Sequence, residues 1–175
     1  MKWYENVMDD AKTAFLLTLS EKIMGKIQNY EWFHEVRQTM DMCWKWVGER
    51  KYSSNELYEK LDREDEDGYE DGLFLLEAMY DEVVNDPQVE LTWFSILDAI
   101  CYTTWQAYKY EKRKSLPQTL ESESDETIDK FMEKIKQVDE YQEELVERLK
   151  EYLLANYPAG SDKRIKREKL LSLIC

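Results

Sequence analysis

The chain has 175 residues, with 24 lysines and arginines against 38 aspartates and glutamates, and its formal net charge is -14 at pH 7. Its hydrophobic share of 43% is that of a folding chain rather than a disordered one, and its length suits one domain. So acidic a protein repels nucleic acid and anionic membranes, since both attract Lys and Arg patches. We therefore expect one domain over residues 1–175, with a basic protein as its partner.

The sequence also indicates where the protein works. No N-terminal basic and apolar leader is visible, and no apolar run approaches the roughly 20 residues that span a bilayer. The three cysteines are scattered, which is untypical of a disulfide framework and favours buried thiols, with Cys175 loose at the terminus. The expected location is the cytoplasm.

Helical spacing begins near the N-terminus. Residues 3–27 predict one long helix or two short ones, and residues 29–47 predict a second helix. In that second helix Trp44 falls on the apolar stripe, whereas Trp46 lies about 110° from its centre, at the edge of the core. Gly48 stands where a left-handed C-terminal cap is expected.

The next stretch combines a helix start with an acidic loop. Ser53 and Glu56 have the spacing of a capping box, which predicts a short helix through Leu61. Like charges and two glycines over residues 62–72 indicate an exposed loop. A fourth helix is predicted over residues 73–83, closed by the turn at Pro87.

The second half of the chain predicts three more helices. Residues 88–112 carry apolar side chains over a broad arc, which is typical of a central helix. A polar linker over residues 115–124 precedes a predicted long helix over residues 125–156, and Asp162 is the expected cap of a last short helix. The fold class is therefore all-α: a single-domain helical bundle of about six to seven helices, with one long helix near the C-terminus.

Enzymatic and metal sites find little support in the residues. His34 is the only histidine, and no cysteine pair has zinc-ligand spacing. Aligning Gly68 with the glycine of a calcium-binding EF-hand loop puts Arg63 and Phe74 at the two anchoring ligand positions, where carboxylates are required. We expect no enzyme, no metal and no cofactor.

The segment from Cys43 to Arg50, with the Glu-Leu-Tyr of residues 56–58, carries a family resemblance. It resembles the all-helical immunity-protein family numbered six of bacterial polymorphic toxin systems, over about residues 15–110. The residues that carry it are Cys43, Trp44, Trp46, Gly48, Glu56, Leu57, Tyr58, the Leu-Thr-Trp of residues 91–93, Ala107 and Tyr108. The resemblance implies a protein that binds a cognate bacterial toxin domain and neutralises it.

The charge distribution indicates how such a partner would be bound. Fourteen acidic residues stand against only Lys60 and Arg63 between residues 56 and 90, a balance of -12. Such a surface favours a basic, nuclease-type toxin, with an aromatic side chain as anchor. The expected partner-binding residues are Trp46, Glu64, Asp65, Glu66, Asp67, Tyr69, Glu70 and Asp71.

One other function remains open from the sequence. The chain is also compatible with an acidic helical adaptor or scaffold protein that binds a different basic partner or associates with itself through the long helix.

Overall fold

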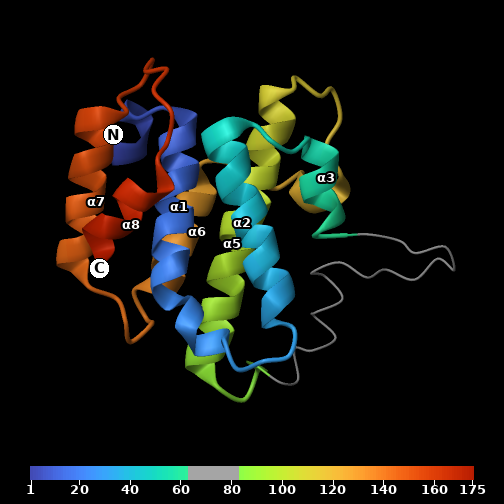
Figure 1. The fold of residues 1–175 in the computed structure, drawn as a ribbon, viewed down its shortest axis with the longest axis vertical. Coiled ribbons are helices and arrows are strands. Elements are labelled where there is room, and N and C mark those ends of the chain that lie inside the picture. Colours follow the sequence, from blue (N-terminus) through green and yellow to red (C-terminus); the bar gives the residue numbers. More distant parts are fainter. Residues whose placement is uncertain (63–82) are drawn as a thin grey trace, which may run out of the picture.

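The structure is a computed structural model that describes residues 1–62 and 83–175. Across these residues the chain forms seven α-helices and three short 3-10 segments, with no strand beyond an isolated bridge between Val7 and Pro158. Figure 1 shows the helices gathered in one bundle, with both termini on the side of α7 and α8. The all-α expectation is confirmed. The predicted acidic loop and most of the predicted fourth helix lie outside the described residues.

The first helical stretch is divided into three elements. The 3-10 segment η1 (Trp3–Asn6) precedes α1 (Asp9–Ile23), and η2 (Met24–Ile27) follows it directly. Most side chains of α1 are buried, as is expected of a helix enclosed by others. Its buried hydroxyls do not remain unpaired, because Thr18 and Ser20 donate to backbone carbonyls one turn back, at 2.6 and 2.8 Å.

Two further helices complete the centre of the bundle. α2 (Phe33–Glu49) and α5 (Pro87–Tyr110) both pack against α1 and against each other. α5 begins at a cap formed by Asp86, whose carboxylate accepts from the backbone N–H of Gln88 at 3.0 Å, and it has a proline in its first turn. Because α5 also contacts α3 (Ser54–Glu59) and α6 (Glu126–Ile135), its predicted central place in the bundle is confirmed.

The predicted capping box is present at α3 (Ser54–Glu59). The Ser53 hydroxyl accepts from the Glu56 N–H at 3.2 Å, and the Glu56 carboxylate accepts from the Ser53 N–H at 2.7 Å. The helix is also fixed to the end of α5, because Glu111 accepts from the Ser54 N–H at 2.9 Å. α3 thus has a defined position on the bundle just before the acidic segment begins.

The predicted long helix over residues 125–156 is wrong in the structure. The stretch forms α6 (Glu126–Ile135) and α7 (Glu143–Asn156), joined by a turn. The side chain of Gln88 binds two backbone groups of the turn. It donates to the Gln137 carbonyl and accepts from the Asp139 N–H, both at 2.8 Å. The turn lets α6 pack on α5 while α7 packs on α1 and α8, which one straight helix cannot do.

The last helix starts later than Asp162. α8 (Arg167–Ile174) follows an irregular stretch in which the Tyr157 carbonyl accepts from the Met8 N–H at 3.0 Å and the Ala159 N–H donates to the Asn6 carbonyl at 2.9 Å. These bonds tie residues 157–159 to the start of the chain. α8 then begins at Arg167, and the residue before it, Lys166, makes no capping hydrogen bond with its side chain.

The buried side chains form one continuous hydrophobic cluster that reaches every helix named above. Cys43 and Cys101 lie inside it as free thiols, and Cys175 is exposed, as the sequence predicted. None of the helices in the described part of the chain has the length and apolar character needed to cross a bilayer.

Candidate functional site

The predicted partner-binding residues fall almost entirely outside the described part of the chain. Of the eight, only Trp46 lies within it; Glu64, Asp65, Glu66, Asp67, Tyr69, Glu70 and Asp71 lie outside the described residues. The site that the structure does describe is built around Trp46, at the end of α2.

Trp46 is not at an exposed edge, and this corrects the sequence expectation. Only 2% of its surface is accessible. Two groups from outside the apolar stripe of α2 cover the ring: the Arg50 guanidinium, 4.2 Å from the ring centroid, and the Tyr110 ring, 6.3 Å away at 84°. Partner contact by Trp46 therefore stays a prediction, and any such contact meets Arg50 and Tyr110 first.

The left-handed residue at the end of α2 is Arg50 rather than Gly48. Arg50 has φ 56° and ψ 35°, while Gly48 is still within the helix. A Cβ added to Gly48 would lie 3.5 Å from the Ile165 carbonyl oxygen, an ordinary contact. Gly48 therefore lies inside α2, facing the loop before α8 with room for a side-chain methyl group, and it is not a cap.

The side chain of Arg50 compensates for its unfavourable backbone. One terminal nitrogen, Nη1, donates to the carbonyls of Trp46 and Val47, in the last turn of the helix, at 3.1 and 3.2 Å. The Trp46 carbonyl also accepts from the Arg50 backbone N–H at 2.8 Å. The other, Nη2, lies 2.7 and 2.9 Å from the two carboxylate oxygens of Asp10. These charge-assisted bonds join the end of α2 to the start of α1.

Arg50 also makes cation–π contacts with two aromatic rings, which are nearly perpendicular to each other. Its guanidinium lies 4.2 Å from the centroid of Trp46 and 4.5 Å from that of Tyr110. We call Asp10, Trp46, Arg50 and Tyr110 the Arg50 platform. Tyr110 forms its outer surface, with 60% of its area exposed; in the described part of the chain the only other large hydrophobic residue classed as exposed is Met1.

Two hollows adjoin the platform. The larger, of about 300 Å³, is lined on its far side by Asp9, Gln106 and Lys109. The smaller, of about 190 Å³, is lined on its far side by Glu49 and by Asp162, Lys163 and Arg164 of the loop before α8. Asp10, Arg50 and Tyr110 line both, so the platform forms the ridge between them.

The acids beneath this ridge are engaged within the chain. Burial raises the pKa of Asp10 above its ordinary value, although the hydrogen bond and charge of Arg50 act to lower it. Asp9 lies 3.0 Å from the Lys12 ammonium and 3.8 Å from that of Lys109. Their negative charge is therefore largely compensated before any partner arrives.

Cations are concentrated around the same end of the bundle. α2 and α5 both end here, and the loop before α8 lies at the same end of the bundle, as Figure 1 shows. These three segments carry Arg50, Lys51, Lys109, Lys112, Arg113, Lys114, Lys163, Arg164 and Lys166. The cations at the ends of α2 and α5 are favoured by the helix dipole, which attracts positive charge to helix C-termini. Together with Lys163, Arg164 and Lys166 of the loop before α8, they form a basic region in an otherwise acidic protein.

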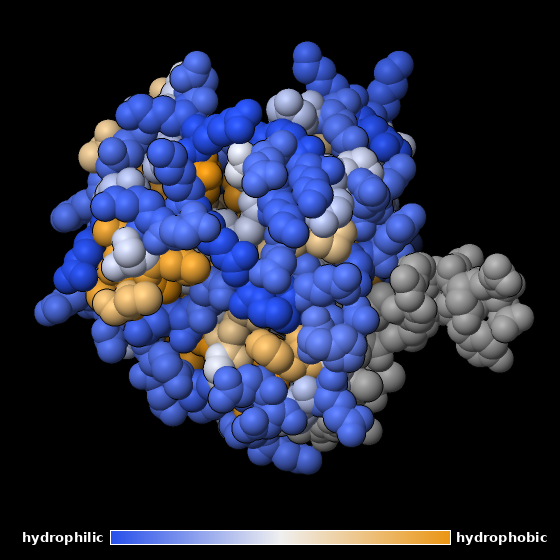
Figure 2. All heavy atoms as spheres, viewed as in Figure 1, coloured by the Kyte–Doolittle hydropathy of each residue, from blue (hydrophilic) through white to orange (hydrophobic). Residues whose placement is uncertain are grey.

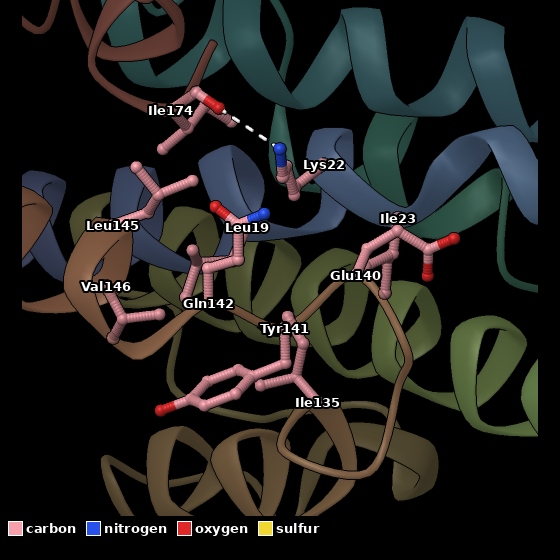
Figure 3. Close-up of a pocket in the computed structure, with 10 residues that line it drawn as sticks. All are labelled: Leu19, Lys22, Ile23, Ile135, Glu140, Tyr141, Gln142, Leu145, Val146 and Ile174. Carbon is pink, nitrogen blue, oxygen red and sulfur yellow. Dashed lines mark hydrogen bonds between the residues drawn. The ribbon is translucent and has the colours of Figure 1, made fainter.

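Further hollows lie elsewhere in the described structure. A basin of about 560 Å³ lies along α2 beside His34, Met42 and Tyr52. An apolar crevice between α1, α7 and α8 holds only about 10 Å³; Figure 3 shows Leu19, Val146 and Ile174 lining it, with Lys22 donating to the Ile174 carbonyl. Figure 2 shows hydrophilic residues over most of the face in view, with apolar atoms only in small groups.

A metal centre is not formed by the residues the structure describes. They contain no group of three or more His, Cys, Asp or Glu side chains able to hold an ion. His34 is at the surface, with 75% of its side chain exposed and its Nδ1 2.8 Å from the Glu31 carbonyl oxygen.

Comparison with known families decides the classification. Residues 11–138 match the family described as Immunity protein Imm6, which is well over half of the chain. The chain belongs to the Imm6 immunity-protein family. Membership places it among proteins that act against a toxin. Neither the curated proteins nor the solved structures gave a match.

The Imm6 match extends from α1 through α6 and into the turn after it, further than the resemblance over residues 15–110 implied. It contains Trp46, Arg50 and Tyr110, while Asp10 lies one residue before it. The sequence predicted Trp46 as a site residue but not its contact with Arg50 or the pairing of Arg50 with Asp10. Arg50 directly follows the helix in the sequence, but it and Asp10 are 40 positions apart.

Proposed function

We propose that this Imm6 protein binds a cognate bacterial toxin domain made in the same cell and neutralises it, and that the toxin is a basic, nuclease-type domain met by an acidic surface. The family membership carries the proposal that the partner is a toxin. The charge supports the class of toxin: residues 63–82 hold nine acids and one arginine, hence -8 of the net charge of -14, and leave -6 for the other residues.

The proposed mechanism follows from electrostatics. A nuclease groove is lined by cations that hold phosphates, and a row of carboxylates can occupy the same groove. Long-range attraction accelerates the encounter, and desolvated Arg–carboxylate bonds slow release. The acids of residues 64–71 supply the field in this account, and an aromatic side chain such as Tyr69 supplies the apolar anchor.

The chemistry of the described residues supports inhibition by binding rather than by catalysis. Burial raises the pKa of the Cys43 thiol to about 12, against a smaller lowering by its hydrogen bond with Thr103, so this sulfur is not an active nucleophile. The pKa of Cys101 is also raised, mainly by burial. The single histidine lies on the surface, away from both thiols in the core.

The proposal is tested with the toxin domain encoded next to this gene. The two proteins should co-purify, and an equimolar amount of the chain should abolish the toxin's nuclease activity. Changing Asp65, Glu66 and Asp67 to Lys should weaken inhibition, whereas the same change at the exposed residues Glu121, Glu133 and Glu151 should not, although the net charge changes equally. Undiminished nuclease activity in the presence of excess wild-type chain would refute the proposal.

A further inference from the structure

We propose that the Arg50 platform is a second contact surface for the toxin, and that it receives an acidic segment of the toxin with an apolar side chain beside the carboxylate. The inference rests on the proposed function for the identity of the partner. It assigns to the described end of the bundle a charge preference opposite to that of residues 63–82.

The platform is ordered before any partner binds. Arg50 is held by Asp10, by two backbone carbonyls and by the rings of Trp46 and Tyr110. A partner that packs on Tyr110 therefore has little side-chain freedom to remove, which lowers the entropic cost of association. Arginine, tryptophan and tyrosine are also the residues that most often dominate the affinity of interfaces.

Tyr110 is the apolar element of the surface. It lines both hollows and remains 60% exposed, although its ring centroid lies 4.5 Å from the Arg50 guanidinium. A volume of about 300 Å³ is at the lower limit for small-molecule sites, roughly 300–1,000 Å³, and the smaller hollow is below it. Each hollow is suited to one or two side chains of a partner protein rather than to a cofactor.

The uncompensated charge of the surface is positive. Nine cations of the surrounding segments stand against Asp9, Asp10, Glu49, Glu111 and Asp162. Three of these acids are engaged inside the chain: Asp9 with lysines, Asp10 with Arg50, and Glu111 with the Ser54 N–H. Lys163 and Arg164 line the smaller hollow and are exposed, so a carboxylate entering it meets positive charge.

Opposite charges at two places on one protein restrict how a partner can dock. A basic groove of the toxin is attracted to residues 63–82, while an acidic flank is attracted to the Arg50 platform. In the reversed orientation the acidic flank of the toxin is repelled by the acids of residues 63–82 and its basic groove by the Arg50 platform, so this orientation is disfavoured. The platform thus contributes the orientation as well as affinity.

Dissociation constants of the toxin complex test the inference. Tyr110→Ala should weaken binding about 10- to 30-fold, a typical loss for an interface anchor, while Tyr110→Phe should bind within about twofold of wild type. The double change Lys163→Glu and Arg164→Glu should weaken binding at least about tenfold. The control is Lys130→Glu with Lys136→Glu, at two exposed lysines of α6 and the turn after it, and it should leave binding nearly unchanged. Thermal unfolding of each free variant excludes loss of the fold.

The outcomes separate the inference from the proposed function. If the toxin binds wild type, the Tyr110→Ala variant and the Lys163 and Arg164 double variant equally tightly, the inference is wrong and the proposed function stands. Tighter binding by the Lys163 and Arg164 variant shows a basic partner segment there and also overturns the inference. A change in the sedimentation of that variant alone, without effect on toxin binding, identifies a second copy of the chain as the occupant. If wild type does not bind the toxin, both proposals fail.

Discussion

Trp44 of α2 donates a hydrogen bond from its indole Nε1 to the carboxylate of Glu21 on α1, at 3.0 Å. The same carboxylate accepts from Arg37 at 2.6 and 2.8 Å and from Arg167 of α8 at 3.0 Å. One acidic side chain, only 12% exposed, therefore joins α1 and α2 to α8, which lies at the other end of the chain.

Glu21→Gln should destabilise the protein by about 2–3 kcal/mol at pH 7, because it removes charge-assisted bonds from a buried carboxylate while both arginines remain. Urea unfolding of wild type and variant measures the difference. Glu151→Gln, at an exposed position of α7, is the control and should change stability by less than about 0.5 kcal/mol. Equal stability of wild type and Glu21→Gln would show that the cluster of Glu21, Arg37, Trp44 and Arg167 contributes nothing to the free energy of unfolding.

The same cluster predicts a pH dependence. Burial raises the pKa of Glu21, but the hydrogen bonds and charges of Arg37, Trp44 and Arg167 outweigh it, and the net pKa lies below its ordinary value of 4.5. A lowered pKa contributes stability above 4.5 that is lost as the pH falls through the folded-state value. The difference in unfolding free energy between wild type and Glu21→Gln should therefore be largest at neutral pH and become smaller below pH 4.5. A difference that grows in acid would contradict the lowered pKa of Glu21.

Gly48→Ala tests the position of the left-handed cap. Because Gly48 is helical and the added Cβ has room, alanine should stabilise the protein by about 0.5–1 kcal/mol. A glycine in the left-handed conformation would instead make alanine unfavourable by about 1 kcal/mol. The sign of the change in urea midpoint distinguishes the two, and a loss of stability would place the cap at Gly48 after all.

The thiols provide a direct test of burial. A small aromatic disulfide reagent should label one cysteine, Cys175, in the native protein at neutral pH, and all three in denaturant. Cys43 and Cys101 are both inaccessible and held as thiols by their raised pKa values. Cys175→Ser should abolish native labelling. Rapid labelling of that variant without denaturant would contradict the described core.

Sequence patterns predicted those parts of the fold that local physics determines. The apolar stripe of α2, the capping box of Ser53 and Glu56, and the broad apolar arc of α5 each depend on residues within a few turns of one another. The turn between α6 and α7 was missed because no glycine or proline marks it. Two of its hydrogen bonds are made with the side chain of Gln88, about 50 residues away in the chain, and no pattern within residues 125–156 contains that partner.

The same limit explains the candidate site. Helical geometry predicted the direction in which Trp46 points, but its cover by Tyr110 and the anchoring of Arg50 on Asp10 are contacts between distant segments. The acidic charge of residues 63–82 is evident from composition alone. The basic region around the Arg50 platform could not be predicted from composition, because its cations come from three segments that only the fold brings together.

The association rate constant of chain and toxin, measured by stopped flow over a range of salt concentrations, tests the proposed charge-guided neutralisation most directly. For wild type we expect fast association at low salt and a steep fall as salt screens the attraction. For the variant with Asp65, Glu66 and Asp67 changed to Lys, we expect slower association and a shallower salt dependence, with unchanged thermal stability. Equal rates for the two proteins at every salt concentration would contradict the account.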